Sequence, residues 1–568
     1  ILYPYDATVW PRGLLAPLLQ WAPATHTFDA VMIKLHEKNF DYTGTFAKNA
    51  TPFINLPIPQ QVWHTLSYSN EGGNDPVTVT IVFEDSTTTT AIGPYTMTWH
   101  IAPGTLKGTV YYNSYGTALV TNSGEASCAT TDTCCIKNMN GNGCTTVART
   151  GPAFGAATLA IHPGTTDPVV IAGTGSTNNT GCRVCHAVSA NGSSLITQHG
   201  SNYALSSLYA LTMANAETQL TPATNVAFPA LAPDGTWFMS SVGTISGDTS
   251  TRAYDTAGAL LPTQPSFGNT MWTSFGGGFP TFSPDGKHLA FNYQASTGGT
   301  TSADQKSLGV LSYDPTNKVF SNYVKLNTPA SGVASWSSFL PTNDAVVFEN
   351  ELNSSAGFGF TRYGNTGSLY WVDLATQTAH ALDNLNGKGY APTTTAHPND
   401  TIQNFEPTVN PVVSGGYAWV VFTSRRLYGN VATIAPNLSD PREYPWLDPA
   451  QHTPKKLWVA AIDLNAPAGS DPSHPAFYLP AQELLAGNSR GFRTVDPCHP
   501  DGTGCDTGDE CCGGYCRPGG DGGALICTNQ QPSCSQQFEK CTTTADCCGA
   551  ATGITCINGF CSMSTPIQ

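Results

Sequence analysis

The chain has 568 residues and a formal net charge of −15, and only 11% of its residues are charged. A chain of this length exceeds what one hydrophobic core supports, so about two to four domains are expected. The excess of negative charge argues against a nucleic acid or an anionic membrane as a partner. No apolar run approaches about 18 residues, so no membrane span is expected. Abundant Gly, Thr, Asn and Ser favour a turn-rich, all-β protein outside the cytosol.

The first 125 residues alternate polar and apolar side chains in short stretches, clearest at 31–36, 77–83 and 95–100. This period of two is typical of strands that are buried on one face. We therefore predict a β-sandwich of immunoglobulin or fibronectin type over residues 1–125. The chain opens at Ile1 in the manner of a mature protein after signal-peptide cleavage, without an N-terminal Cys for lipidation.

The 18 cysteines fall into three groups of even number. Two stand at positions 182 and 185, four lie between 128 and 144, and twelve crowd the segment 498–561. The group of four predicts a disulfide-bonded linker over residues 126–150; its members are Cys128, Cys134, Cys135 and Cys144. Even groups of this kind suit disulfides and indicate an oxidising compartment.

Residues 182–186 read Cys-Arg-Val-Cys-His, the one C-x-x-C-H in the chain. Two thiols at this spacing can each add across a haem vinyl group, and the following His can ligate the iron. We therefore predict one covalent c-type haem on Cys182 and Cys185, with His186 as the proximal ligand. A Cys182–Cys185 disulfide and half of a zinc site are the alternatives, although no nearby segment supplies the second ligand pair that zinc needs. Haem c attachment in the bacterial periplasm agrees with an exported protein.

A repeat governs the middle of the chain. Phe-Pro-Ala-Leu-Ala-Pro-Asp-Gly at 228–235 recurs as Phe-Pro-Thr-Phe-Ser-Pro-Asp-Gly at 279–286, with degenerate copies at 338–348 and 406–411. A period of this size with strand–turn–strand chemistry is typical of a β-propeller. Within each turn, Pro fixes φ, Asp caps its own turn and Gly takes a positive φ.

The haem motif falls inside this repeat. Aligning residues 190–192 with Pro-Asp-Gly at 233–235 places Cys185 and His186 where Phe228 and Pro229 stand. The haem is therefore expected at the start of the first blade's innermost strand, at the mouth of the central channel.

Five blades follow from the aligned strand positions Val188, Leu231, Phe282, Phe339 and Val409. A sixth blade can be closed by outer strands at 157–164 and 168–172 together with an inner strand at 491–495, which would leave no open sheet edge. We predict six blades over residues 151–497.

The repeat resembles the TolB-like, WD40-like propeller family, whose blades begin with a Pro-x-Phe-Ser-Pro-Asp-Gly segment. The resemblance covers about residues 182–465 and is strongest at 279–286. It implies the fold and carries no function with it.

After residue 497 two successive units read Cys-x6-Cys-x5-Cys-Cys, each followed by two further cysteines. They resemble inhibitor-cystine-knot modules, over 498–530 and 531–568. In that family the first Cys pairs with the fourth, the second with the fifth and the third with the sixth; the sequence alone allows fifteen pairings per module. Modules of this size depend on their bridges. They are interpreted as a binding module or as a protease-resistant cap or assembly contact.

The ligand opposite His186 decides the chemistry, because a filled position suits electron transfer and an open one suits ligand binding or peroxide chemistry. Met271 is the first choice, since its loop should lie on the haem's face of the propeller. His199, which follows the returning strand of the haem-bearing hairpin, is the alternative, and His397 is a third option. The residues expected to line the haem are Trp272, Phe275 and Phe279.

The whole chain resembles uncharacterised secreted monohaem propeller proteins of the kind that myxobacteria encode. These combine a Cys-x-x-Cys-His-x-Val-Ser-x-x-Gly segment, a segment like 416–429 and a Cys-rich tail. The resemblance implies the architecture and export, and it implies no activity. We expect the protein outside or on the surface of a bacterium, with the periplasm as the second choice.

The residues favour a single-electron carrier that works with a redox partner protein or with identical subunits in a homo-oligomer or filament. The acidic surface would favour a basic partner. A structural or adhesive surface protein, in which the haem is incidental or stabilising, is the alternative. A haem peroxidase is a third hypothesis, but no general base stands out for it, so no catalytic residue is predicted.

Overall fold

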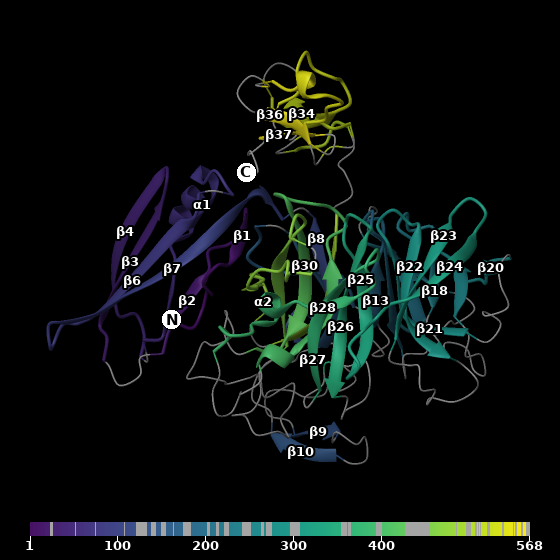
Figure 1. Ribbon diagram of the computed structural model, residues 1–568, viewed down its shortest axis with the longest axis horizontal. Helices are drawn as coiled ribbons and strands as arrows, with labels where there is room; N and C mark the ends of the chain where they lie inside the picture. The colour runs from purple at the N-terminus through teal and green to yellow at the C-terminus, as the bar shows by residue number, and fades with distance from the viewer. Residues whose placement is uncertain are drawn as a thin grey trace. The chain divides into compact units, whose positions relative to one another are not determined.

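The fold is that of a computed structural model, which is mostly β and whose elements are labelled in Figure 1. The structure describes residues 1–22, 27–51, 53–73, 75–106, 108–120, 133–137, 144–148, 155–162, 164–173, 183–200, 205–211, 215–220, 226–240, 251–262, 266–267, 275–295, 307–353, 361, 365–392, 400–426, 455–467, 469–483, 486–495, 501–505, 508, 511, 513–519, 523–536, 539–548, 550, 554–557 and 560–563. They form two compact units: Ile1–Asn70 with Asp75–Val495, and Asp496–Gln568 with Glu71–Asn74.

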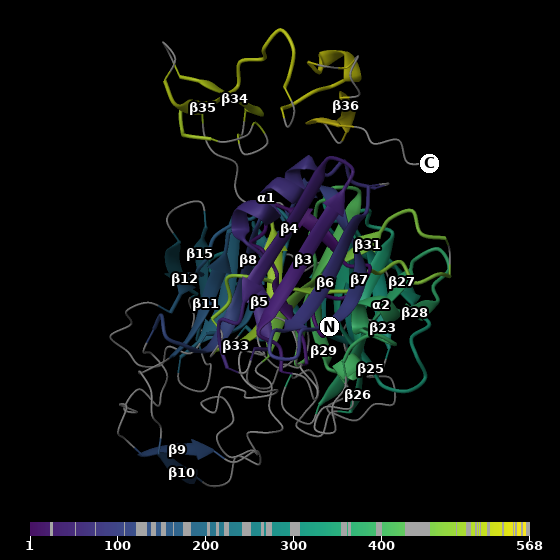
Figure 2. The same ribbon diagram turned by 90° about the vertical axis from the view of Figure 1, so that its left-hand side faces the viewer.

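The N-terminal part of the first unit is built on one twisted sheet (Figure 2). Its strands, in spatial order, are β1 (Val9–Arg12), β7 (Thr90–Thr105), β6 (Val77–Asp85), β3 (Ala30–Glu37) and β4 (Phe40–Ala47). β3 and β6 alternate in burial along most of their length, as their sequences predict. The buried face is covered by the helix α1 (Gln60–Ser69) and by a two-stranded sheet of β2 (Leu18–Gln20) and β5 (Asn55–Pro57).

This arrangement differs from the β-sandwich expected over residues 1–125. Alternation shows which face of a strand is buried but not what covers it, and here α1 supplies Trp63 and Leu66 to that face. The helix begins after Pro59 without a side-chain cap, so it carries no recognisable start signal. The domain also ends earlier than expected, because β8 (Thr109–Thr117) belongs to the propeller.

Six sheets follow one another as the blades of a propeller in the described part of the chain (Figure 1). The first three, from the innermost strand outward, are β13 (Val184–Val188), β14 (Ser194–His199), β15 (Leu205–Ala210) and β16 (Ala216–Gln219); β17 (Ala230–Leu231), β18 (Trp237–Ser240) and β19 (Arg252–Asp255); and β21 (Phe275–Phe282), β22 (His288–Ala295), β23 (Leu308–Asp314), β24 (Val319–Lys325) and β20 (Ser266–Phe267).

The next two blades have four strands each. They are β25 (Val333–Phe339), β26 (Ala345–Asn353), β27 (Thr366–Asp373) and β28 (Ala379–Ala381); and β29 (Asn404–Val409), β30 (Tyr417–Ser424), β31 (Lys456–Asp463) and β32 (Phe477–Tyr478). The short helices α2 (Asp383–Asn386) and η3 (Asp400–Ile402) lie in the connection between them.

The sixth blade closes the ring from three separate stretches of sequence. Its strands are β33 (Gly487–Thr494), β8, β11 (Gly155–Ile161) and β12 (Val169–Ala172). The innermost strands contact one another in sequence order, and β33 contacts β13 again. The six-bladed closure by distant segments is thus confirmed, and β8 is the strand that sequence reasoning assigned to the neighbouring domain.

The repeated turns behave as their sequences predict. The N–H of Gly235 donates to Ala232 O at 2.8 Å and that of Gly286 donates to Ser283 O at 2.9 Å. Both glycines have a positive φ, of 72° and 69°. All five aligned positions lie at the ends of innermost strands, in β13, β17, β21, β25 and β29.

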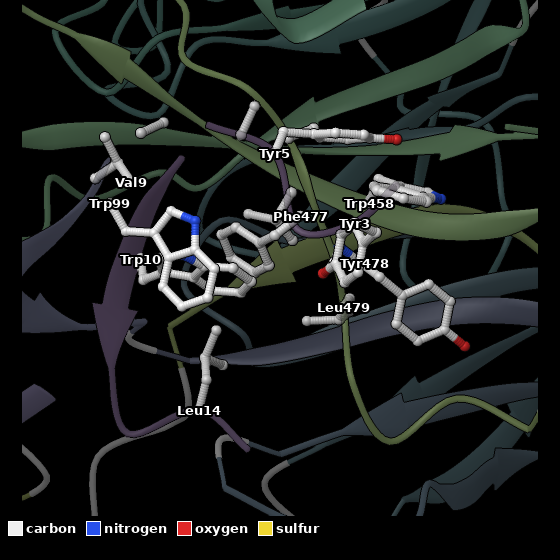
Figure 3. Close-up of a cluster of buried hydrophobic side chains, with 14 of the residues drawn as sticks. Tyr3, Tyr5, Val9, Trp10, Leu14, Trp99, Trp458, Phe477, Tyr478 and Leu479 are labelled. Atoms are coloured by element: carbon white, nitrogen blue, oxygen red, sulfur yellow. Dashed lines mark hydrogen bonds between the residues drawn. The ribbon is translucent and has the colours of Figure 1, made fainter. Parts of the chain in front are cut away.

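The N-terminal sheet packs on the fifth blade through a cluster of aromatic side chains (Figure 3). Trp10 of β1 stacks on Phe477 of β32, with ring centroids 4.8 Å apart. Tyr3 meets Trp458 of β31 edge to face at 5.8 Å, and its hydroxyl accepts from the N–H of Tyr478 at 3.1 Å. The two domains therefore share one hydrophobic core.

The predicted linker 126–150 contains a hairpin of β9 (Thr133–Lys137) and β10 (Cys144–Ala148). The disulfides expected of its four cysteines lie outside the described side chains. No helix in the described ranges is long and apolar enough to cross a membrane.

The second unit is held by disulfides around two small hairpins, β34 (Tyr515–Pro518) with β35 (Leu525–Thr528), and β36 (Ile554–Ile557) with β37 (Phe560–Met563), plus the turn η6 (Thr544–Asp546). Its described disulfides are Cys505–Cys516, Cys511–Cys527, Cys534–Cys548, Cys541–Cys556 and Cys547–Cys561. This is the order that the cystine-knot resemblance implied. The remaining pair, Cys498 and Cys512, lies outside the described residues.

Candidate functional site

One residue with a positive φ stands at the same place in each blade, within the innermost strand or, in the second blade, just before it. Their φ angles lie between 47° and 51°, and the residues are Cys185, Phe228, Phe279, Trp336, Glu406 and Arg490. Such a φ is uncommon outside glycine. In five of the six blades it coincides with a shift of register in the pairing to the next strand, which marks a β-bulge. We call these six residues the bulge ring.

The aromatic members of the bulge ring meet across the propeller axis. The centroid of the Phe279 ring lies 4.6 Å from that of Phe228 and 4.2 Å from that of Trp336. Phe228 and Trp336, which are two blades apart, are 5.4 Å from each other. The guanidinium carbon of Arg490 lies 4.2 Å from the Trp336 ring centroid. These side chains therefore fill the channel at this level.

The other half of the ring is polar. The Oε2 atom of Glu406 accepts from Ser489 Oγ at 2.8 Å and from Thr423 Oγ1 at 3.1 Å. Burial lowers the pKa of the Arg490 guanidinium to about 10, against the opposing attraction of Glu406 and Cys185. The second cysteine of the haem motif thus lies within electrostatic reach of a buried cation.

The segment that carries the motif is anchored to the outer strands of the first blade. Arg183 is buried, and its Nε and Nη2 atoms donate to the hydroxyl of Tyr209 at 3.3 and 3.2 Å. Its Nη2 also lies 3.6 Å from Glu217 Oε1. Cys182 lies outside the described residues.

His186 points into the seam between the first and sixth blades. Its side chain is 1% exposed, its Nε2 lies 3.2 Å from Tyr111 O in β8, and its ring meets Phe492 of β33 edge to face at 5.1 Å. Burial, with a smaller effect of Arg490, lowers the pKa of His186 to about 3. The imidazole is therefore neutral at physiological pH, which is the form that binds metals.

The structure describes one of the three predicted distal ligands, His199. His199 is in β14, where its Nε2 lies 2.7 Å from Ser207 Oγ and 4.0 Å from Glu217 Oε1. Burial, then Arg183, lowers its pKa to about 4. The hydrogen bond to Ser207 keeps His199 inside the first blade. Met271 and His397 lie outside the described residues.

Of the three side chains expected to line the haem, one can be placed. Phe279 is a member of the bulge ring, together with Cys185. Trp272 and the side chain of Phe275 are not among the described parts of the chain.

A cavity opens on the other side of the bulge ring, toward the Pro-Asp-Gly turns. All six innermost strands contribute to its lining, with the residues that follow the bulge in each blade; they include Val188, Leu231, Phe282, Phe339, Val409 and Phe492. Arg490 is the one bulge-ring residue that reaches this lining.

Sequence reasoning did not single out Trp336, Glu406 and Arg490. A signal for the first two was present, because each bulge residue stands three positions before the aligned strand position, as Cys185 stands before Val188. Arg490 had no such guide, since the sixth blade lacks the repeat sequence.

No protein-family model matches the chain, and no curated protein matches it in sequence. Among solved structures it is similar to TolB from Acinetobacter baumannii, at 10% identity and a TM-score of 0.31, over 71% of this chain and 79% of that one. It is also similar to a protein of unknown function from Bacteroides thetaiotaomicron (9%, TM-score 0.29, 74% and 94%) and to oligogalacturonate lyase from Vibrio parahaemolyticus (10%, TM-score 0.30, 61% and 82%). These likenesses are too weak to carry any activity over, and the propeller is assigned from its own six sheets.

Proposed function

We propose that this chain is an exported c-type cytochrome that transfers single electrons, with one haem on Cys182, Cys185 and His186. The observation that carries the proposal is the place of the motif. Cys185 occupies the bulge position of the first blade, where the second and third blades carry Phe228 and Phe279. A thiol at this position lies next to the aromatic half of the bulge ring, and an apolar surface of this kind suits a haem.

The chemistry of the donor set fits the group. The spacing of the thiols and the adjacent histidine are those of haem c attachment. Burial keeps the pKa of His186 low, so its imidazole is neutral, which is the form that binds a metal. When bound, the haem supplies a one-electron redox centre.

Ligation requires one rearrangement in the chain. Cys185 belongs to the bulge ring, whereas His186 packs between β8 and β33. The imidazole must therefore turn away from Phe492 to meet the iron of a haem held by Cys185. Met271 remains the proposed distal ligand, and the hydrogen bond of His199 to Ser207 makes His199 the weaker choice.

The decisive experiment is the visible spectrum of the purified full chain, oxidised and dithionite-reduced, with a pyridine haemochrome. We expect one c-type haem per chain and a low-spin spectrum with a sulfur-to-iron band. Cys182→Ala with Cys185→Ala should abolish covalent attachment, because both thioether bonds are lost, and Met271→Ala should remove the sulfur band alone.

His199→Ala is the matched control, because it removes a buried histidine of the same blade and should leave the spectrum unchanged. A high-spin spectrum that shifts with cyanide would replace electron transfer by an open-site activity. A protein without haem, with a Cys182–Cys185 disulfide on mass spectrometry, would refute the proposal.

The second proposed function is that of a structural or adhesive surface protein. It is favoured by the tail, whose five described disulfides fit an extracellular or periplasmic compartment and resist proteolysis. Oligomeric state separates the two: a filament with distant haems, or with none, supports the structural function, whereas closely spaced haems support conduction through identical subunits.

A further inference from the structure

We propose that the cavity above the bulge ring binds a small organic carboxylate, held by Arg490 at its floor. The inference does not depend on the haem, since none of the described residues that line the cavity belongs to the haem motif. Two of the lining residues, Arg490 and Arg493, are cationic, and none of the described residues that form it is acidic, in a chain with a net charge of −15.

Arg490 is the cation with unused hydrogen-bonding capacity. It is 8% exposed, and its Nη1 has no hydrogen-bond partner among the described residues. Its guanidinium is held between two rings, with Cζ 4.2 Å from the Trp336 centroid and 4.5 Å from that of Phe492. Such stacking fixes the plane of the guanidinium, which is the geometry that binds a carboxylate through two parallel hydrogen bonds.

No protein carboxylate takes that role. Glu406, the acidic member of the bulge ring, attracts the guanidinium, but its Oε2 accepts from Ser489 and Thr423, and no ion pair joins it to Arg490 in the part of the chain that the structure describes. Buried cations normally have a partner, because leaving one unpaired is costly. Arg490 therefore favours a negatively charged ligand.

Two other polar side chains of the wall already have partners. Ser338 Oγ accepts from the N–H of Val409 at 2.9 Å, and Arg493 Nη2 donates to Gly108 O at 3.1 Å. Asp234 follows the lining residue Pro233, and its Oδ1 accepts from the N–H of Thr236 at 3.0 Å within the same turn. The ligand's charge is thus expected to meet Arg490.

The walls select the rest of the ligand. Most of the lining side chains are apolar, and they include five prolines from the turns and the bulges: Pro229, Pro233, Pro280, Pro284 and Pro411. Such side chains favour a ligand with a short alkyl chain, which gains from burial, over phosphate or sulfate, which stay strongly hydrated. A carboxylate with a short apolar tail matches both Arg490 and the apolar side chains of the lining.

The test is titration of the purified full chain with propionate, followed by saturation-transfer NMR and by the unfolding temperature. Saturable binding is expected for propionate, with little for propionamide, its neutral isostere, or for inorganic phosphate. Arg490→Met should weaken propionate binding by about tenfold or more, since hydrogen bonds to charged groups contribute about 1.5–3 kcal/mol. Lys287→Met removes an exposed cation from a nearby turn and should leave the affinity unchanged.

A second variant guards against a folding defect in Arg490→Met. Ala190→Trp leaves Arg490 in place and fills the cavity from the first blade's turn, so it should also abolish binding. Unchanged affinity in either folded variant, or equal binding of propionamide, would overturn the proposal. Preferential binding of phosphate would do so as well. None of these outcomes bears on whether haem is attached.

Discussion

The propeller and the Cys-rich tail are stabilised by different means. The propeller with its N-terminal sheet buries large apolar side chains, including Trp10, Trp419 and Trp458 at 1% exposure or less. In the tail the buried clusters consist mainly of cysteines, such as Cys541, Cys547 and Cys561. A short chain cannot bury enough apolar surface to offset its conformational entropy, so covalent links replace the core.

The stability of the two regions also depends on different conditions. The described core of the first unit depends on burial, which reducing agents do not affect. The second depends on disulfides, which persist only in an oxidising compartment. Four predictions can break or sharpen this contrast.

The largest effect is expected where the first unit's two domains share their core. Trp458→Ala removes a fully buried ring that contacts Tyr3 and Tyr478. A loss of about 3–5 kcal/mol is expected from such a deletion. Urea denaturation of the full chain measures it, and Tyr95→Ala, at 42% exposure, is the control that should cost little. Equal losses in both would contradict a shared core.

The tail should respond to the loss of one bridge. Cys547→Ala with Cys561→Ala opens a link between residues 14 apart, which is expected to cost about 3 kcal/mol. Hydrogen exchange should then rise across 534–563 while β30 keeps its protection. Loss of protection in β30 as well would mean that the propeller depends on the tail.

Sequence and structure agree where a local signal repeats. The repeat located five blades because each copy keeps part of the same local sequence, most completely in the two Pro-Asp-Gly turns. The cysteine spacing predicted a bridged tail for the same reason. In both cases the information lies within about fifty residues of chain.

Sequence reasoning failed where position depends on distant partners. β8 carries no repeat sequence, and only its pairing with β11 and β33 assigns it to the sixth blade. Arg490 likewise has no local motif, and its role follows from meeting Trp336 across the axis. Of the candidate site, Cys185 and Phe279 lie in one ring, as their alignment suggested, whereas the direction of His186 could not be read from the sequence.

A buried carboxyl makes the stability of the propeller depend on pH. Glu349 in β26 is 1% exposed, and its Oε2 accepts from the N–H of Glu406 at 2.9 Å. Burial, then Glu351 and Glu406, raises the pKa of Glu349 well above its ordinary value of 4.5. The folded chain then holds a proton that the unfolded chain releases, so stability falls as pH rises from 4.5 toward the folded-state pKa.

Glu349→Gln should remove this contribution while keeping an acceptor for the Glu406 N–H. The stability of the variant relative to the native chain should therefore increase with pH, by up to about 1.4 kcal/mol per unit. Urea denaturation across this range measures it. The exposed Glu84→Gln is the matched control, and a parallel pH profile for native chain and Glu349→Gln would refute the assignment.

The smallest effect concerns the contact between the two disulfide modules. Glu539 is 2% exposed; its Oε2 accepts from Gln536 N at 2.6 Å and from Arg517 Nη2 of the other module. The N–H of Lys540 also donates to Gly514 O at 3.0 Å. Glu539→Gln removes the charge but keeps an acceptor, so a loss of about 1–2 kcal/mol is expected.

A double-mutant cycle with Arg517→Met isolates the pair. A coupling of about 1 kcal/mol, read from hydrogen exchange at 515–528 and 554–563, would show that the modules stabilise each other through this contact in addition to their own bridges. Asp501→Asn, an exposed change in the first module, should show no coupling. Additive losses for Glu539 and Arg517 would instead mean that each module depends on its disulfides alone, and the contrast with the propeller would then be complete.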